Sequence, residues 1–136
     1  MPGKVYRTAI YCRLSREDGD KVESNSIASQ RAICEDYIAR HDDLEIVCEP
    51  FVDDGYSGVS FNRPNFKKLE DAIRKGAIDC IVVKDLSRFS RNYIDGGRYL
   101  EKIFPQLGIR FIAVNDAYDS LTGDPQSTTP TARIYP

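Results

Sequence analysis

Four apolar runs, separated by segments whose apolar residues have helical spacing, constrain the fold of this chain more than any other feature. Residues 5–14, 44–52, 78–83 and 109–114 are rich in β-branched and aromatic side chains, which is typical of strands. The run 78–83 is almost wholly apolar, as expected of a parallel strand covered on both faces. Strands that alternate with helices predict an α/β domain, in which a mainly parallel sheet lies between two helical layers.

Three further segments carry helix signals, which are apolar side chains at helical spacing, a polar N-cap or proline before them and glycine after them. The helices are predicted over residues 27–40 behind Ser24 or Ser26, from Pro64 to a stop at Gly76, and over residues 93–107 with Gly108 at the end. Polar loops are expected at residues 16–24 and 53–58.

Length and composition fit one domain. The 136 residues are 41% hydrophobic and 29% charged, which suffices for one buried core. We expect the folded domain to cover residues 1–120, and the polar, proline-bearing residues 121–136 to form an irregular tail. No run approaches the ~18 apolar residues of a membrane span, and the N-terminus lacks a signal-peptide core, so a cytoplasmic protein is the simplest expectation.

The cysteines do not indicate a metal site. They are widely spaced, without any Cys-x-x-Cys pair, and only one histidine accompanies them. We therefore expect reduced, mostly buried thiols at Cys12, Cys34, Cys48 and Cys80. Cys34 and Arg40 have the spacing of a phosphatase loop, but the residues between them lack glycine and look helical, so that match is attributed to chance.

Charge is unevenly distributed along the chain. The net charge of −2 by itself argues against a DNA-binding surface, because nucleic-acid-binding modules are usually basic. Residues 1–16 carry +4, residues 17–54 carry −9 and residues 55–136 carry +3. This distribution predicts one acidic face and one basic face.

Several polar side chains follow the predicted strands directly. Ligands of parallel sheets gather at the carboxyl ends of the strands, so we expect Ser15, Asp53, Arg88 and Arg91 to share one crevice. Side chains alternate along a strand, which places Arg13 and Ser15 on one face, while Cys12 and Leu14 point into the core. Arg88 and Arg91 are three residues apart and are predicted to share a face of a helical first turn.

The order of these residues resembles a known family. The set consists of Tyr11-x-Arg13-x-Ser15, Gln30, Asp53 with Ser57-Gly58, Arg63-Pro64, and Ser87-Arg88-x-x-Arg91-Asn92. This ordered set resembles the catalytic domain of the serine recombinases, the resolvase and invertase family, over roughly residues 5 to 120. The extended loop 16–24 and the motif Ser-Arg-Phe-Ser-Arg-Asn at residues 87–92 are most similar to the larger transposon and phage integrase members. The resemblance implies a resolvase-like three-layer α/β/α fold.

The resemblance also implies a chemistry. Ser15 matches the nucleophile, which attacks a DNA phosphodiester and leaves a 5′-phosphoserine link and a free 3′-hydroxyl. Four arginines match those that bind the scissile phosphate and stabilise the transition state without a metal or other cofactor: Arg13, Arg63, Arg88 and Arg91. Gln30, Asp53, Asp85 and Asn92 are supporting positions, with Asp53 expected to orient an arginine.

Two departures from the family pattern accompany these matches. The family commonly has aspartate directly before the first arginine of its Asp-Arg-x-x-Arg motif, and this chain has Ser87 there. Asp85, two residues earlier, can supply the carboxylate. Beyond residue 120 the family continues into a long dimerisation helix and a DNA-binding region, neither of which is recognisable in residues 121–136.

The implied partners are DNA and, in a full-length protein, further copies of the chain as a dimer or tetramer. No membrane and no small-molecule substrate are implied, and the family points to a bacterial, phage or mobile-element origin. The expected function is the catalytic domain of a site-specific DNA recombinase. We expect the 136 residues alone to bind DNA weakly and nonspecifically and not to recombine it.

Two alternatives stay open. The chain could be a noncatalytic remnant that only folds or associates with a full-length recombinase. A receiver-like signalling domain is also α/β, but it needs an acidic pair after its first strand, where Arg13 and Ser15 stand. The lone His41 at a predicted helix end disfavours a serine–histidine triad, and the chain has no Gly-x-x-x-x-Gly-Lys loop for ATP.

Overall fold

The strands form one mainly parallel sheet. The computed structural model describes residues 3–15 and 26–121, except the side chain of Tyr93. In these residues the strand order is β2-β1-β4-β5-β6, and β3 also pairs with β1, on the strand edge that faces away from β4. All pairs are parallel except β5 with β6. The strands are β1 (Tyr6–Leu14), β2 (Leu44–Ile46), β3 (Phe51–Asp54), β4 (Cys80–Val83), β5 (Arg110–Ala113) and β6 (Tyr118–Asp119).

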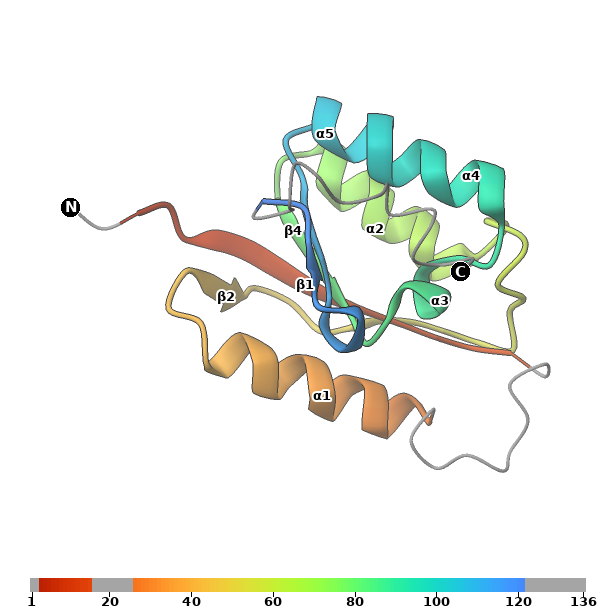
Figure 1. Cartoon of the computed structure of the whole chain (residues 1–136), viewed down its shortest axis with the longest axis horizontal. Helices are drawn as coiled ribbons and strands as arrows, with labels where there is room; N and C mark the ends of the chain where they lie inside the picture. The colour runs from red at the N-terminus through yellow and green to blue at the C-terminus, as the bar shows by residue number, and fades with distance from the viewer. Residues whose placement is uncertain (1–2, 16–25, 122–136) are drawn as a thin grey trace.

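Helices cover both faces of the sheet. Helix α1 (Ile27–Ala39) lies on one face, and α2 (Pro64–Arg74), α4 (Tyr93–Arg98) and α5 (Phe104–Gln106) lie on the other (Figure 1). Helix α3 (Leu86–Phe89) is a single turn after β4. This arrangement confirms the predicted α/β/α fold with a mainly parallel sheet.

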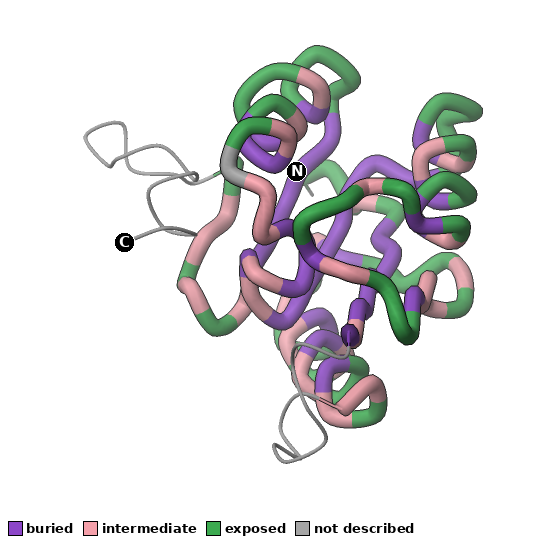
Figure 2. Tube along the Cα trace, turned by 90° about the vertical axis from the view of Figure 1, so that its right-hand side faces the viewer, coloured by how far each residue is buried: buried purple, intermediate pink, exposed green. Residues whose placement is uncertain are grey.

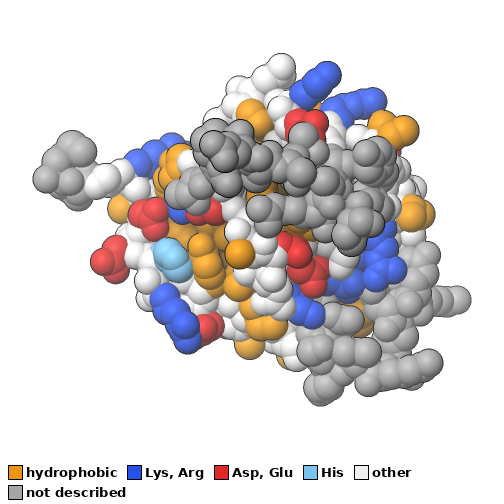
Figure 3. All heavy atoms as spheres, viewed as in Figure 1, with side chains coloured by type: hydrophobic (Ala, Val, Ile, Leu, Met, Phe, Trp, Pro, Cys, Tyr) orange, Lys and Arg blue, Asp and Glu red, His pale blue; other side chains and the backbone are white. Residues whose placement is uncertain are grey.

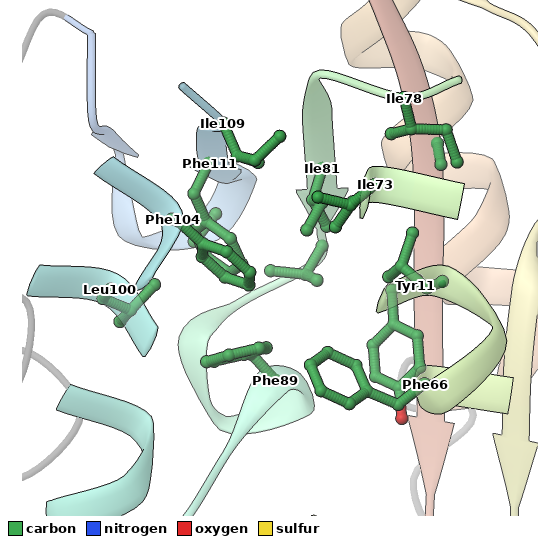
Figure 4. Close-up of a cluster of buried hydrophobic side chains, with 14 of the residues drawn as sticks. Tyr11, Phe66, Ile73, Ile78, Ile81, Phe89, Leu100, Phe104, Ile109 and Phe111 are labelled. Carbon is green, nitrogen blue, oxygen red and sulfur yellow. The ribbon is translucent and has the colours of Figure 1, made fainter. Parts of the chain in front are cut away.

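Alternation along β1 divides the core in two. Ala9 and Tyr11 pack into the cluster beneath α2 and α5, where aromatic rings from several elements meet (Figure 4). Ile10 and Cys12 point to the other face and pack against α1. The buried segments accordingly run through the middle of the molecule, and the outer turns of the helices are exposed (Figure 2).

The cysteines belong mostly to the smaller core. Cys12, Cys34 and Cys80 are fully buried, and all four cysteines are free thiols. Burial disfavours the thiolate and raises the pKa of Cys12 and of Cys80 to about 12. These thiols are therefore protonated packing groups, as the sequence predicted.

The run 44–52, predicted as one strand, forms two. Thr8 of β1 pairs with Ile46, whereas Tyr11, three residues later, pairs with Phe51, five residues later. The edge strand therefore carries two extra residues at this point, where Pro50 has no N–H to offer a ladder. Strand β3 then extends to Asp54, so Asp53 and Asp54 lie in a strand and not in the predicted loop.

The predicted helix 93–107 is confirmed in extent but not in regularity. Between α4 and α5 the chain makes a π-helical turn, η3 (Tyr99–Ile103), in which the Phe104 N–H donates to the Tyr99 carbonyl, five residues earlier. Pro105 follows directly. Because proline has no N–H, it cannot donate the hydrogen bond that a regular α-helix would make at this position. Gly108 ends the segment with a positive φ of 71°.

The last described segment differs from the prediction. After β5 come a 3-10 turn, η4 (Val114–Asp116), and the short antiparallel strand β6, neither of which was predicted. The predicted loop 16–24 and nearly all of the predicted tail lie outside the described residues. None of the described helices has the length and apolarity needed to cross a membrane.

Candidate active site

Topology places the site at the carboxyl end of β1. This strand has β3 on one side and β4 on the other, and the helices that follow β1 and β3 cover opposite faces of the sheet. A sheet of this kind has its binding crevice where the strand order reverses. Ser15 follows β1 directly and is 7% exposed, and the α3 turn follows β4.

Arg13 is wholly buried and is held by backbone carbonyl groups. Its Nε donates to the carbonyl of Arg88 at 3.1 Å, Nη1 to that of Tyr56 at 3.0 Å and Nη2 to that of Ser87 at 2.7 Å. The guanidinium thus ties the end of β1 to the α3 turn and to the loop after β3. These carbonyls accept from all three nitrogen atoms of the guanidinium.

Arg63 is held in the same way at the start of α2. Its Nε donates to the carbonyl of Ser60 at 2.8 Å, Nη1 to that of Phe89 at 2.5 Å and Nη2 to that of Gly58 at 3.2 Å. The side chain is 0% exposed. Like those of Arg13, the acceptors for the Arg63 guanidinium include backbone carbonyls from distant segments.

Arg88 is the third buried arginine at this end of the sheet, and a carboxylate lies near it. Its Nη1 donates to the carbonyl of Arg13 at 3.0 Å, and its Nε lies 3.8 Å from Oδ1 of Asp85. Asp85 also accepts the N–H of Arg88 at 3.1 Å and the hydroxyl of Ser87 at 2.6 Å. Asp85 is thus an acidic neighbour of Arg88, and the Ser87 hydroxyl donates a hydrogen bond to Asp85.

Arg91 does not share a helical turn with Arg88, so that prediction is wrong. Helix α3 ends at Phe89, Ser90 is extended, and α4 begins only at Tyr93. The N–H of Arg91 donates instead to the carbonyl of Gly58 at 2.6 Å. Arg91 is half-buried, and its backbone is fixed to the loop that follows β3.

Gln30 fastens the end of β1 to α1. Its amide oxygen accepts from the N–H of Arg13 at 3.2 Å, and its amide nitrogen donates to the carbonyl of Arg13 at 3.0 Å. The side chain is fully buried. It thus gives Arg13 the pair of hydrogen bonds that a neighbouring strand would give, on the edge where β4 has already ended.

Asp53 caps a helix that has no cap of its own. Its carboxylate accepts the N–H groups of Asn65 at 3.0 Å and Phe66 at 2.9 Å, and the hydroxyl of Tyr11 at 2.9 Å. The predicted orientation of an arginine is indirect, since Arg63 Nη1 lies 3.4 Å from the Tyr11 oxygen. Desolvation raises the pKa of Tyr11, so the phenol stays protonated as the donor.

Asn92 caps helix α4. Its Oδ1 accepts the N–H of Asp95 at 2.9 Å, and its Nδ2 donates to the carbonyl of Val59 at 2.9 Å. The second bond ties the start of α4 to the loop after β3. Sequence reasoning had assigned no role to Tyr11 or Gly58, although both lie within the recognised motifs.

The described residues hold no group of three or more histidine, cysteine or acidic side chains that could bind a metal. On the face shown in Figure 3, acidic and basic side chains are intermixed, so the predicted separation into acidic and basic faces is not seen there. The positive charge of the site comes instead from buried arginines. Such an arrangement can hold an anion next to Ser15.

Solved structures of known proteins share this fold. The N-terminal catalytic domain of TP901-1 integrase has a TM-score of 0.75 and 26% identity, over 86% of this chain and 83% of that one. A resolvase family site-specific recombinase from Streptococcus pneumoniae has a TM-score of 0.68 and 28% identity, over 88% and 78%.

In sequence, a protein of Bacillus subtilis (strain 168) named "Putative DNA recombinase" is 31% identical over 87 residues. These make up 64% of this chain and 16% of that protein, so the chain spans a small part of its curated relative. Residues 8–133 match the family model described as "Resolvase, N terminal domain". The chain therefore belongs to the resolvase family of serine recombinases.

Proposed function

We propose that this chain is the DNA-cleaving catalytic domain of a serine recombinase and that Ser15 is its nucleophile. The observation that carries the proposal is the convergence of three fully buried arginines, Arg13, Arg63 and Arg88, at the carboxyl end of the strand that Ser15 follows. Serine is a weak nucleophile by itself, and guanidinium groups that stabilise a developing phosphoryl charge compensate for this.

Charge balance supports an anionic substrate. Arg63 donates to the carbonyls of Phe89 and Gly58, which bind the guanidinium without cancelling its charge. Asp85 is 3.8 Å from Arg88, and Asp53 reaches Arg63 only through Tyr11. A buried surplus of positive charge is costly unless an anion accompanies it, and a DNA phosphate is such an anion.

The proposed reaction conserves the energy of the broken bond. Ser15 Oγ forms a bond to the phosphorus as its proton leaves, and the bond from phosphorus to the 3′-oxygen breaks. The 3′-oxygen takes up a proton, and the 5′-phosphate stays on Ser15. Attack by a 3′-hydroxyl of another strand reverses these steps and rejoins the DNA. Arg13, Arg63, Arg88 and Arg91 stabilise the charge in both directions.

DNA affinity and assembly belong to the same proposal. The net charge of −2 does not favour tight binding of DNA by this chain alone. We expect nonspecific binding that is too weak for a gel shift at nanomolar protein and physiological salt. Recognition of a site and assembly into a dimer or tetramer would then depend on further segments of a longer protein.

Trapping of the covalent intermediate tests the proposal. The chain, and any longer protein that contains it, is incubated with random-sequence duplex DNA, denatured and digested, and mass spectrometry locates any nucleotide-bearing residue. We expect the nucleotide on Ser15, no adduct with Ser15→Ala, and an undiminished adduct with Ser120→Ala, an exposed serine beyond β6. An adduct that survives Ser15→Ala would refute the assignment. No adduct from any form would favour a noncatalytic module.

A further inference from the structure

Gly58 lies in the loop between β3 and α2, and its own backbone does not require glycine. Positive φ angles occur at Gly55, Gly76 and Gly108, but Gly58 is not among the described glycines with positive φ. Gly58 is nevertheless buried. Any requirement for glycine at this position therefore concerns space and not backbone conformation.

Three of the four site arginines meet at Gly58. Its carbonyl accepts the N–H of Arg91 at 2.6 Å and Nη2 of Arg63 at 3.2 Å. A Cβ at this position would stand 2.8 Å from Nη2 and 3.0 Å from Cζ of Arg13, and 2.9 Å from Cγ of Arg91. The missing side chain thus leaves the space in which Arg13 and Arg91 approach each other.

Neither arginine can move aside freely. The guanidinium of Arg13 is bound to three carbonyls, two from the α3 turn and one from the loop after β3. The contact on Arg91 is with Cγ, close to the backbone, and that backbone is itself bonded to Gly58. A methyl group at Gly58 would therefore displace one of the two side chains.

We propose that Gly58 is a positioning residue that sets the distance between the Arg13 guanidinium and Arg91 for the phosphoryl transfer. This inference rests on the proposed function, because it assumes that both arginines act on the scissile phosphate. Catalysis is sensitive to such placement, since a shift of about 1 Å in a reacting constellation costs about 100-fold in rate. Gly58 contributes no group to the reaction and acts through its neighbours.

The test compares Gly58→Ala with Gly55→Ala in the same loop. Gly58→Ala should lower the rate of Ser15 adduct formation at saturating DNA about 100-fold, while the DNA concentration for half-maximal rate stays within about twofold. Gly55→Ala strains a positive φ of 93° but meets nothing within 4 Å. It should lower the melting temperature and leave the rate of the folded protein unchanged. A wild-type rate for Gly58→Ala, or equal rate losses for both variants, would overturn the proposal.

A spectroscopic measurement separates this inference from the proposed function. The Nε–H signals of Arg13 and Arg91, observed by ¹⁵N NMR in the free protein, should shift in Gly58→Ala and stay in place in Gly55→Ala. Unchanged signals would contradict the positioning role even if the rate fell. Absence of a Ser15 adduct in the wild-type protein would instead remove the proposed function, whatever the signals show.

Discussion

The two ends of the sheet bury arginine in opposite ways. At the amino end, Arg110 of β5 donates to two carboxylates, with Nε and Nη2 bonded to Asp119 at 3.0 and 2.6 Å and Nη1 bonded to Asp43 at 2.7 Å. At the carboxyl end, Arg13 and Arg63 donate to backbone carbonyls. Carboxylates thus neutralise Arg110 at the amino end, whereas the carbonyls that bind Arg63 at the carboxyl end carry no charge.

Under the proposed function, this difference distinguishes a structural arginine, Arg110, from one that binds the substrate, Arg63. Ion pairing offsets the desolvation of Arg110, and the hydrogen bonds that it donates to Asp119 raise the pKa of its guanidinium. Carbonyl partners fix the position of Arg63 and do not cancel its charge. Burial of an arginine therefore does not by itself indicate an active site, and the chemical nature of its partners has to be considered as well.

Replacement of Arg63 by methionine should have the largest effect on activity. The change removes a charge and three hydrogen bonds to carbonyls, and we expect the rate of Ser15 adduct formation to fall about 1000-fold. Arg63→Lys keeps the charge but loses the planar fork, and should recover no more than about tenfold. Rates are measured on the folded protein below its melting temperature. A rate within tenfold of wild type for Arg63→Met would mean that this charge does not serve the reaction.

Replacement of Arg110 by methionine should lower the stability of the fold and leave the activity nearly unchanged. The loss leaves Asp119, whose side chain is 12% exposed, without its cation, and we expect the free energy of unfolding to fall by about 3 kcal/mol. The Asp43 bond adds little, because that side chain is 42% exposed. Urea unfolding measures the change. The adduct rate should stay within about twofold of wild type, and a larger loss would remove the distinction between the two ends.

The sequence predicted the arginines of the site better than their surroundings. The strand ends predicted one crevice for Ser15, Asp53, Arg88 and Arg91, because the carboxyl ends of parallel strands meet. The order of motifs added Arg13 and Arg63 through the family resemblance. Arg91 was misplaced on a helix, because three-residue spacing was taken as helical although Ser90 between the two arginines is extended. Spacing alone does not show where a short helix ends.

The partners of these side chains could not be predicted, because most of them are backbone groups from distant segments. The carbonyl of Phe89 that receives Arg63, and the N–H groups of Asn65 and Phe66 that bind Asp53, carry no signal in the side-chain pattern. The split of the second strand had one visible signal, Pro50. Gly58 had none beyond its identity, since its role depends on Arg13 and Arg91.

Asp85 is an exception to this comparison, because it is a carboxylate next to an arginine, Arg88, at the carboxyl end of the sheet. Asp85→Ala removes the N-cap of α3 and the acceptor for Ser87, and should lower the free energy of unfolding by roughly 1–2 kcal/mol. Ser87→Ala removes only a donor and should cost less than about 1 kcal/mol. We also expect Asp85→Ala to slow adduct formation about tenfold through Arg88. Equal stability losses for the two variants would show that Asp85 is not the organising group.

The smallest expected effect is a pH dependence at the amino end. The hydrogen bond from Arg110 lowers the pKa of the Asp43 carboxyl in the folded state. Its contribution to stability is therefore complete above the unfolded pKa of about 3.9 and is lost as the pH falls through the lower folded value. Because 42% of the Asp43 side chain is exposed to solvent, we expect the contribution to stay below about 1 kcal/mol.

Urea unfolding of the wild type and of Asp43→Asn, between about pH 5 and pH 2, measures this contribution. The wild type should be the more stable protein at pH 5, and the difference should shrink toward pH 2 as the carboxyl is protonated. Salt should reduce the difference at pH 5, because the pair is near the surface. A difference that persists unchanged at pH 2 would mean that the carboxylate charge of Asp43 does not stabilise the fold, and that Asp119 alone neutralises Arg110.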